Sequence, residues 1–226
     1  MRQKTFYFVR HGESLLNSKG IRQGSDGGLS EKGKAQAQAA GQSLCHLPID
    51  VILVSPYERT RETAAIINQS FQPPRNLEFV ELLKERRNPS EIIGKSVEDP
   101  AVRRIVDTID KAYHSDEFRF SDEENFLDLK ERARKALSYL GKRREKNILV
   151  LTHGIFLRML IAYMLYGDDL NASSYNVMSF QNGASNAGVT ICQYERGWFG
   201  PPKNQRWKLI SWNDHTHERG IQSHTI

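Results

Sequence analysis

Three short hydrophobic runs stand out along the chain, at residues 6–9, 51–54 and 148–151. Runs of this length without a polar interruption are typical of strands buried on both faces, as strands are in parallel sheets. Weaker strand patterns occur at residues 78–82, 189–194 and 208–213. The chain is therefore predicted to contain a sheet whose central strands are covered on both sides.

Helical patterns separate these strands. An alanine-rich segment at 31–44 follows Ser30, a residue type that favours the N-cap of a helix. A second helix is predicted between the second strand and about Asn68, and an apolar helix at 155–166. The alternation of strands and helices predicts an α/β fold of three layers (α/β/α), in which helices flank a mainly parallel central sheet.

The pattern loosens at about 86–120, where Asn-Pro and Asp-Pro steps and mixed charges surround helical turns at 102–113. We interpret this segment as a helical, lid-like insertion that covers a site. Ser121 then matches the first position of a capping box, with Glu124 three residues later. The following helix is predicted to continue to about Arg144.

Length and composition fit one globular domain spanning residues 1–226. The hydrophobic share of 38% and the charged share of 26% exclude wholesale disorder. A net charge of +5 favours anionic partners. The basic cluster at 142–146 is attributed to the last turn of a helix, where cations complement the helix dipole, and no aromatic platform accompanies it. Nucleic-acid binding is therefore not predicted.

The sequence also bears on the cellular compartment. Cys45 and Cys192 form no CxxC or Cys/His spacing, which favours free thiols in a reducing compartment. The apolar segment 155–166 is about half the length needed to span a bilayer and contains Arg158. The N-terminus runs into a strand without the apolar core of a signal peptide. We expect a cytoplasmic protein without a membrane partner.

Polar groups suited to phosphate follow the three hydrophobic runs. Arg10 and His11 end the first strand, Arg59 lies one turn beyond the second, and His153 ends the third. The carboxyl ends of parallel strands share one edge, where open α/β folds bind ligands. Two arginines and two histidines at one point repel each other unless an anion joins them. The pattern therefore predicts a site for a phosphoryl group.

With these residues in place, the chain resembles the histidine phosphatase superfamily, also called the phosphoglycerate mutase-like family. The resemblance runs in order through RHGES (10–14) with Asn17, RQG (22–24) with Asp26, LSEKG (29–33), SPYER (55–59) with ETA (62–64), LKE (83–85), THG (152–154) and WND (212–214) with His217. Blocks in register along nearly the whole chain make a more specific signal than Arg-His-Gly alone.

The resemblance implies that His11 is a nucleophile that takes the phosphoryl group as phosphohistidine. Neutral imidazole is a good nucleophile, and phosphoryl transfer chiefly needs positioning and charge stabilisation. Arg10, Arg59 and His153 would hold the equatorial oxygens of the phosphoryl group. Glu85 would protonate the leaving oxygen and then deprotonate the attacking water.

Further substrate contacts are assigned to Asn17, Arg22 and the Gly154 amide. No cofactor is expected, and no cluster with metal-ligand spacing occurs, since His215 and His217 have no further ligand set nearby. The predicted partner is a small phosphorylated substrate. The oligomeric state is left open, with a dimer among the options.

The segment after Glu85 separates two activities within the resemblance. Residues 86–90 read Arg-Arg-Asn-Pro-Ser, and this matches neither the Tyr-Gly-x-Leu-x-Gly stretch of sister mutases nor the Gly-x-Trp-Glu-Gly of many small phosphatases. We therefore predict a phosphomonoesterase, a histidine acid-phosphatase-type hydrolase, in which Lys84, Arg86 or Arg87 meets a second anionic group. A phosphoglycerate mutase and a phosphoprotein phosphatase are the alternatives, and a catalytically silent phosphate-binding or scaffold protein is a third. The substrate is not identified.

Overall fold

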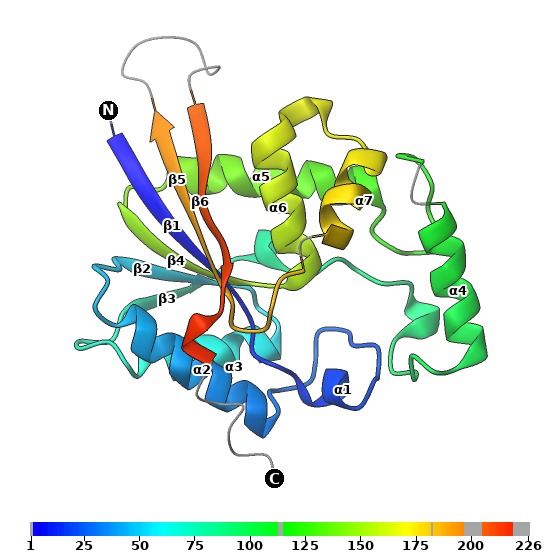
Figure 1. The fold of residues 1–226 in the computed structure, drawn as a ribbon, viewed down its shortest axis with the longest axis horizontal. Coiled ribbons are helices and arrows are strands. Elements are labelled where there is room, and N and C mark those ends of the chain that lie inside the picture. Colours follow the sequence, from blue (N-terminus) through cyan, green and yellow to red (C-terminus); the bar gives the residue numbers. More distant parts are fainter. Residues whose placement is uncertain (1, 113–114, 182, 197–204, 219–226) are drawn as a thin grey trace.

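A six-stranded sheet forms the centre of the described chain (Figure 1). The computed structural model describes residues 2–112, 115–181, 183–196 and 205–218. Its strands are β1 (Arg2–Arg10), β2 (Val51–Val54), β3 (Asn76–Phe79), β4 (Asn147–Thr152), β5 (Val189–Arg196) and β6 (Gln205–Asp214). In the order β3-β2-β4-β1-β5-β6, the first four strands pair in parallel, whereas β5 is antiparallel to both of its neighbours. The prediction of a mainly parallel sheet is confirmed.

Helices cover both faces of this sheet. The described helices are α1 (Leu15–Ser18), α2 (Glu31–Leu44), α3 (Glu58–Asn68), α4 (Pro100–Lys111), α5 (Phe126–Lys142), α6 (Gly154–Tyr166) and α7 (Ala172–Gln181). Helices α2 and α3 lie on one side and α5 and α6 on the other, while α4 stands apart from the sheet (Figure 1). This confirms the three-layer α/β/α prediction. Among the described helices, none combines the length and apolarity needed to cross a membrane.

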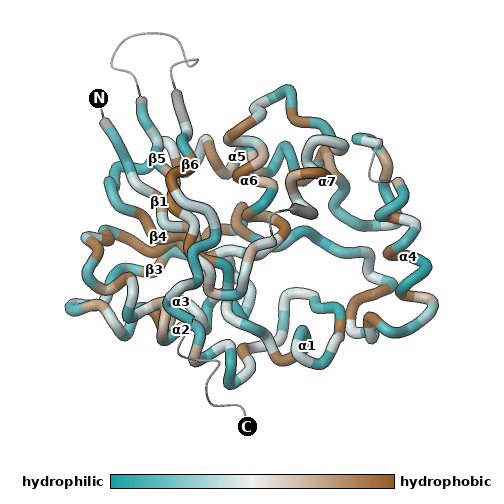
Figure 2. The backbone as a smooth tube through the Cα atoms, in the orientation of Figure 1, coloured by the Kyte–Doolittle hydropathy of each residue, from teal (hydrophilic) through white to brown (hydrophobic). Residues whose placement is uncertain are grey.

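The hydrophobic runs have no polar position because each strand faces a core on both sides. In β1, Phe6 and Phe8 point into the cluster formed with α5 and α6, whereas Tyr7 and Val9 point into the cluster formed with α2 and α3. Strand β4 alternates in the same way. Figure 2 shows hydrophobic residues gathered at these central strands. Burial on two faces fixes the strands whose ends carry the candidate chemistry.

The capping box before α5 lies four residues later than predicted. The Asn125 side chain accepts a hydrogen bond from the Asp128 amide (3.0 Å), and the Asp128 carboxylate accepts one from the Asn125 amide (3.2 Å). Ser121 instead has φ 51° and lies in a turn. The Ser121–Glu124 prediction was wrong. Asn125 directly precedes the residues of α5 that pack into the core, so a helix that begins after Asn125 buries apolar surface from its first turn.

Other element boundaries differ from their predictions by a few residues. The strand expected at 78–82 is β3, which ends at Phe79 and is followed by a short 3₁₀ turn, Glu81–Leu83. The turns expected at 102–113 form α4, which begins earlier because Asp99 caps it and Pro100 occupies its first turn. The predicted end at residue 113 lies outside the described residues. Helix α7 was not predicted.

Gly33 lets helix α2 approach the loop that carries His11. A Cβ at Gly33 would clash with the carbonyl oxygen of Glu13, and one at Gly12 would clash with the carbonyl oxygen of Gly33. Because the loop must move to admit a methyl group, we expect Gly33→Ala to lower the free energy of unfolding by about 1–3 kcal/mol. The control Gly183→Ala places a Cβ in open space and should stay within about 0.5 kcal/mol. Urea unfolding measures both, and equal stabilities would contradict the close approach.

Candidate active site

The ends of three strands bring the two histidines together. Arg10, the last residue of β1, pairs in register with Thr152 at the end of β4, and β2 ends beside β4 on the same edge. The residues that follow β1 and β4 are His11 and His153. Their rings lie 5.1 Å apart between centroids, in an edge-to-face arrangement. Sheet topology therefore joins two histidines that are 142 positions apart (153 − 11) in the chain.

The hydrogen bonds of His11 define which ring nitrogen is free to react. Nδ1 lies 2.7 Å from the carbonyl oxygen of Gly12, which can only accept, so Nδ1 carries the proton. Nε2 accepts from Nε of Arg59 at 3.2 Å. The side chain is only 2% exposed. Burial, followed by the guanidinium groups of Arg59 and Arg10, lowers the pKa of His11 well below its usual value. The ring is thus neutral at pH 7, with its Nε2 lone pair turned toward a cation.

Arg59 lies in the first turn of α3 and is 4% exposed. Its Nη1 donates to the carbonyl oxygen of Gly24 (2.9 Å) and to Oε1 of Gln23 (3.2 Å), and its guanidinium stacks 5.0 Å from the ring centroid of Tyr57. No salt bridge joins it to an acidic group among the described residues. Burial lowers the pKa of Arg59, and the nearby charge of Glu85 acts in the opposite direction without outweighing burial.

Arg10 is the second cation of the site. Its Nη1 donates to the carbonyl oxygen of Ala184, and its Nε is buried without a hydrogen-bond partner in the described part of the chain. Burial lowers the pKa of Arg10, and the cations Arg158 and Arg59 act in the same direction. A Cβ on Gly154 would lie 3.2 Å from Nε of Arg10, so the helix N-terminus and this guanidinium are in close contact.

His153 lies behind His11 and is fully buried. Its Nε2 is 2.7 Å from Oγ of Ser55, at the end of β2, and its ring is edge-on to Tyr57 with 5.1 Å between centroids. Burial, and secondly His11, lowers the pKa of His153 well below its usual value. The sequence identified Ser55 only as the first residue of the SPYER block (55–59). Its contact with His153 depends on the β2–β4 pairing, which no local signal reveals.

The carboxylate of Glu85 caps the N-terminus of α6. Oε1 accepts from the Phe156 amide (3.0 Å) and the Arg86 amide (2.9 Å), and Oε2 accepts from the Ile155 amide (3.3 Å). Negative charge is favourable at this end of a helix. Glu85 is thus fixed beside Gly154, at the wall of the same cavity as His11.

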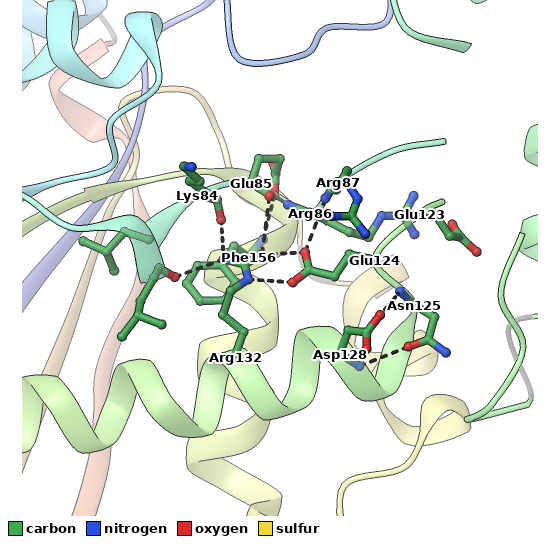
Figure 3. A network of polar contacts seen from close by, with 12 residues as sticks. Lys84, Glu85, Arg86, Arg87, Glu123, Glu124, Asn125, Asp128, Arg132 and Phe156 are labelled. Atoms are coloured by element: carbon green, nitrogen blue, oxygen red, sulfur yellow. Dashed lines mark hydrogen bonds and ion pairs between the residues drawn. The ribbon is translucent and has the colours of Figure 1, made fainter. Parts of the chain in front are cut away.

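Arg132 of α5 holds the loop that carries Glu85 (Figure 3). Its Nε and Nη2 form a bidentate pair with Glu124 at 2.6 and 2.7 Å. Its Nη1 donates to the carbonyl oxygens of Leu82 (3.0 Å) and Lys84 (2.7 Å), and the guanidinium stacks 3.9 Å from the ring centroid of Phe156. One side chain therefore ties α5, the loop before Glu85 and the first turn of α6 together.

We expect Arg132→Gln to lower the free energy of unfolding by about 2–4 kcal/mol. The change would leave the carboxylate of Glu124, which is 13% exposed, without its partner, and two loop carbonyls without their donor. The matched control is Arg134→Gln, two residues along the same helix, where an exposed pair with Glu131 contributes less than about 1 kcal/mol. Chemical denaturation compares the two, and similar losses would show that the Arg132 contacts add little.

A cavity of about 280 Å³ opens in front of His11. The predicted site residues that line it are Arg10, His11, Asn17, Arg22, Arg59, Glu85 and Gly154; His153 does not. Three polar side chains that line it were absent from the predicted site, namely Gln23, Asn88 and Arg158. Arg158 lies one turn after Gly154 on α6, and this four-residue spacing was a signal that the sequence offered. Gln23 donates to Oδ1 of Asn17 at 2.9 Å, so it orders a predicted substrate contact.

In the described ranges of the chain, no group of three or more His, Cys, Asp or Glu side chains is arranged to hold a metal ion. The charged side chains that line the cavity are four arginines and one glutamate, and this excess of cations suits an anion.

The chain belongs to the histidine phosphatase superfamily. The sequence pattern of the family described as "Histidine phosphatase superfamily (branch 1)" matches residues 6–214, which include every residue of the site described above. The resemblance predicted from the sequence is therefore confirmed.

Relatives in this superfamily carry the names of both phosphatases and mutases. The 6-phosphofructo-2-kinase/fructose-2,6-bisphosphatase of Gallus gallus is 32% identical over 165 residues, which are 72% of this chain and 33% of that protein. The "Probable phosphoglycerate mutase GpmB" of Erwinia tasmaniensis is 32% identical over 167 residues, which are 70% of this chain and 74% of that protein. The chain thus spans about a third of the first relative's length and about three quarters of the second's.

Solved structures share the fold. YhfR of Bacillus stearothermophilus matches with a TM-score of 0.78 and 24% identity, over 95% of this chain and 98% of its own. A mycobacterial glucosyl-3-phosphoglycerate phosphatase matches with a TM-score of 0.74 and 21% identity, over 94% of this chain and 99% of its own. At these identities the likeness establishes the architecture alone.

Proposed function

We propose that the protein is a phosphomonoesterase that hydrolyses a small phosphorylated substrate through a phosphohistidine at His11. The observation that carries this proposal is the state of the His11 ring. It is buried and neutral, with the proton fixed on Nδ1 and the Nε2 lone pair directed to a cavity edged by Arg10 and Arg59. A phosphoryl group placed there meets a nucleophile and two guanidinium groups at once.

In the first step Nε2 of His11 attacks phosphorus, and the bond between phosphorus and the ester oxygen breaks. Arg59 keeps its Nε–H proton, but the hydrogen bond that this group donates to Nε2 of His11 is replaced by one to a phosphoryl oxygen. Arg10 binds another phosphoryl oxygen, so both guanidinium groups stabilise the charge spread over these oxygens. The Nδ1–H bond to the Gly12 carbonyl persists and stabilises the positive charge that the ring gains. The protonated carboxyl of Glu85 gives its proton to the leaving oxygen, which departs as an alcohol.

In the second step a water molecule attacks the phosphohistidine. The Glu85 carboxylate takes a proton from this water, the bond between phosphorus and Nε2 breaks, and inorganic phosphate leaves. His11 returns to its neutral form and Glu85 to its protonated form. The position of Glu85 supports this double role, because its carboxylate is fixed at the first turn of α6 on the cavity wall.

The proposed role of Glu85 predicts a dependence on the leaving group. We expect Glu85→Gln to slow the first turnover of an alkyl phosphate by about 10²–10⁴-fold, since an alkoxide leaves poorly without a proton. The first turnover of p-nitrophenyl phosphate should change far less, because p-nitrophenolate needs no proton, and a burst of nitrophenol should precede a slow steady state. Rapid-quench kinetics measures both rates. Equal slowing of the two first turnovers would mean that Glu85 is not the acid.

A phosphoglycerate mutase is the second candidate, favoured by the 32% identity to the Erwinia relative that bears this name. A mutase would interconvert phosphoglycerates and release little free phosphate. An assay of phosphate release with and without added bisphosphoglycerate separates the two activities. We expect release without it, because residues 86–90 lack the stretch that the mutases carry after the acidic residue.

We also propose that residues 86–120 act as a lid over the site. Asn88 and Val97 of this segment line the cavity, and Ser96 forms an isolated β-bridge with Ile21 on the opposite wall. The segment thus reaches across the mouth of the cavity from the Glu85 loop to the loop after α1.

A further inference from the structure

A second chamber adjoins the catalytic cavity. It measures about 200 Å³ and shares four lining residues with that cavity, namely Arg22, Asn88, Ile155 and Arg158. It adds Arg86 from the loop after Glu85 and Asp110 from α4. Because these four residues line both chambers, the two lie side by side.

The charges of the second chamber are unbalanced. Three guanidinium groups line it, from Arg22, Arg86 and Arg158, and Asp110 is the one carboxylate among its described lining residues. Burial, followed by the charge of Arg86, lowers the pKa of Arg22, so two of these cations repel each other, and Asp110 offsets this only in part. An added anion would remove this repulsion, as a phosphoryl group does beside His11.

Hydrogen-bonding capacity is also unused. The Nε atoms of Arg22 and Arg158 are both buried without a partner in the described residues. The one side-chain hydrogen bond of Arg158 to a described residue is a long contact of 3.4 Å with the carbonyl oxygen of Ser179. Buried guanidinium donors normally find acceptors, and a carboxylate or phosphate matches their forked geometry. The two arginines come from different elements, one from the loop after α1 and the other from α6.

We propose that this chamber, with Arg22 and Arg158 as its main ligands, binds a second anionic group of the substrate. This inference rests on the proposed function and narrows its substrate class to phosphomonoesters that carry a further phosphate or carboxylate on a short carbon framework. The ester phosphate binds at His11 and the second anion binds between Arg22 and Arg158. Asp110 faces the same chamber and opposes anion binding, so it limits the affinity.

Matched pairs of compounds test the proposal through the ratio of their two Kd values. The carboxylate pair is 3-phosphoglycerate and glycerol 3-phosphate, and the phosphate pair is 1,3-propanediol bisphosphate and 3-hydroxypropyl phosphate. Within each pair only the second anion differs. Calorimetric titration onto the full-length His11→Gln variant, which lacks the nucleophile, gives a Kd for each compound without turnover. We expect the doubly anionic member of at least one pair to bind about tenfold tighter or more, and the pair that shows it identifies the anion.

Substitutions in the same background assign the effect to residues. We expect Arg22→Gln and Arg158→Gln each to reduce the ratio about tenfold, and Asp110→Asn to increase it. Arg86 is left unchanged because it directly follows Glu85 in the chain. Ratios near one for both pairs, or ratios that none of the three substitutions changes, would overturn the second site. If the ratios hold but the wild-type protein releases phosphate from none of the four compounds, the anion site stands and the proposed hydrolysis fails.

Discussion

Replacement of His11 by alanine is expected to abolish phosphate release, with a fall in kcat of at least roughly 10³-fold. The change removes the only protein atom that bonds to phosphorus in the proposed mechanism. Arg10 and Arg59 would still attract the substrate, because Arg59 keeps its bonds to Gln23 and Gly24 and Arg10 keeps its bond to the carbonyl oxygen of Ala184. The loss should therefore appear in kcat rather than in KM, in a steady-state assay of phosphate release.

The matched control for His11 is His46→Ala. His46 is exposed and lies outside the cavity, so its loss should leave kcat unchanged. His11→Ala is expected to fold, since the small buried ring can be replaced without leaving a charge unpaired. If His11→Ala retains full turnover while its far-UV circular dichroism is native, the imidazole is not the nucleophile.

Arg59→Ala is expected to lower kcat/KM by about 10²–10³-fold, the scale on which single donors to a developing anion act. The Tm, in contrast to the activity, should not fall. Burial lowers the pKa of Arg59, and no described acidic group forms a salt bridge with it, so the folded state holds this cation at a cost. We therefore expect the Tm of Arg59→Ala to equal or exceed that of the parent.

Arg61→Ala provides the control for this prediction. Arg61 lies two residues further along α3, is exposed, and stacks near Phe79 far from His11. Its removal should change neither kcat/KM nor Tm beyond small surface effects. Thermal melts combined with kinetics separate the outcomes. A parallel fall of activity and Tm in Arg59→Ala would show that the arginine supports the fold and not the reaction.

Much of the fold was predictable because the strongest signals in the sequence coincide with the strongest constraints in the structure. The run at 148–151 has no polar residue because it is covered on both faces, and the same burial places β4 between β1 and β2. Once those strands are parallel, His11 and His153 must share an edge. The juxtaposition of Arg10, His11, Arg59 and Glu85 at one cavity follows from that topology.

The remainder depends on contacts between distant segments. In the sequence, Arg132 is one of several cations on a polar helix. Only the folded chain shows that its guanidinium donates to the carbonyl oxygens of Leu82, Lys84 and Glu85. Ser121 and Asn125 offer two overlapping cap patterns, and packing of the apolar face of α5 decides between them. The spacing of Arg158 after Gly154 places it near the site, but only the folded chain shows that it lines a chamber shared with Arg22.

The proposed mechanism depends on a covalent bond between His11 and phosphorus. The most direct test is to mix the protein with a ³²P-labelled alkyl phosphate, quench within the first turnover, and map the labelled peptide. We predict one label on the peptide that contains His11, sensitive to acid and stable to base, which disappears in a chase with unlabelled substrate as phosphate is released. Phosphate release at the same rate without any such label, or with the label on another residue, would contradict the mechanism.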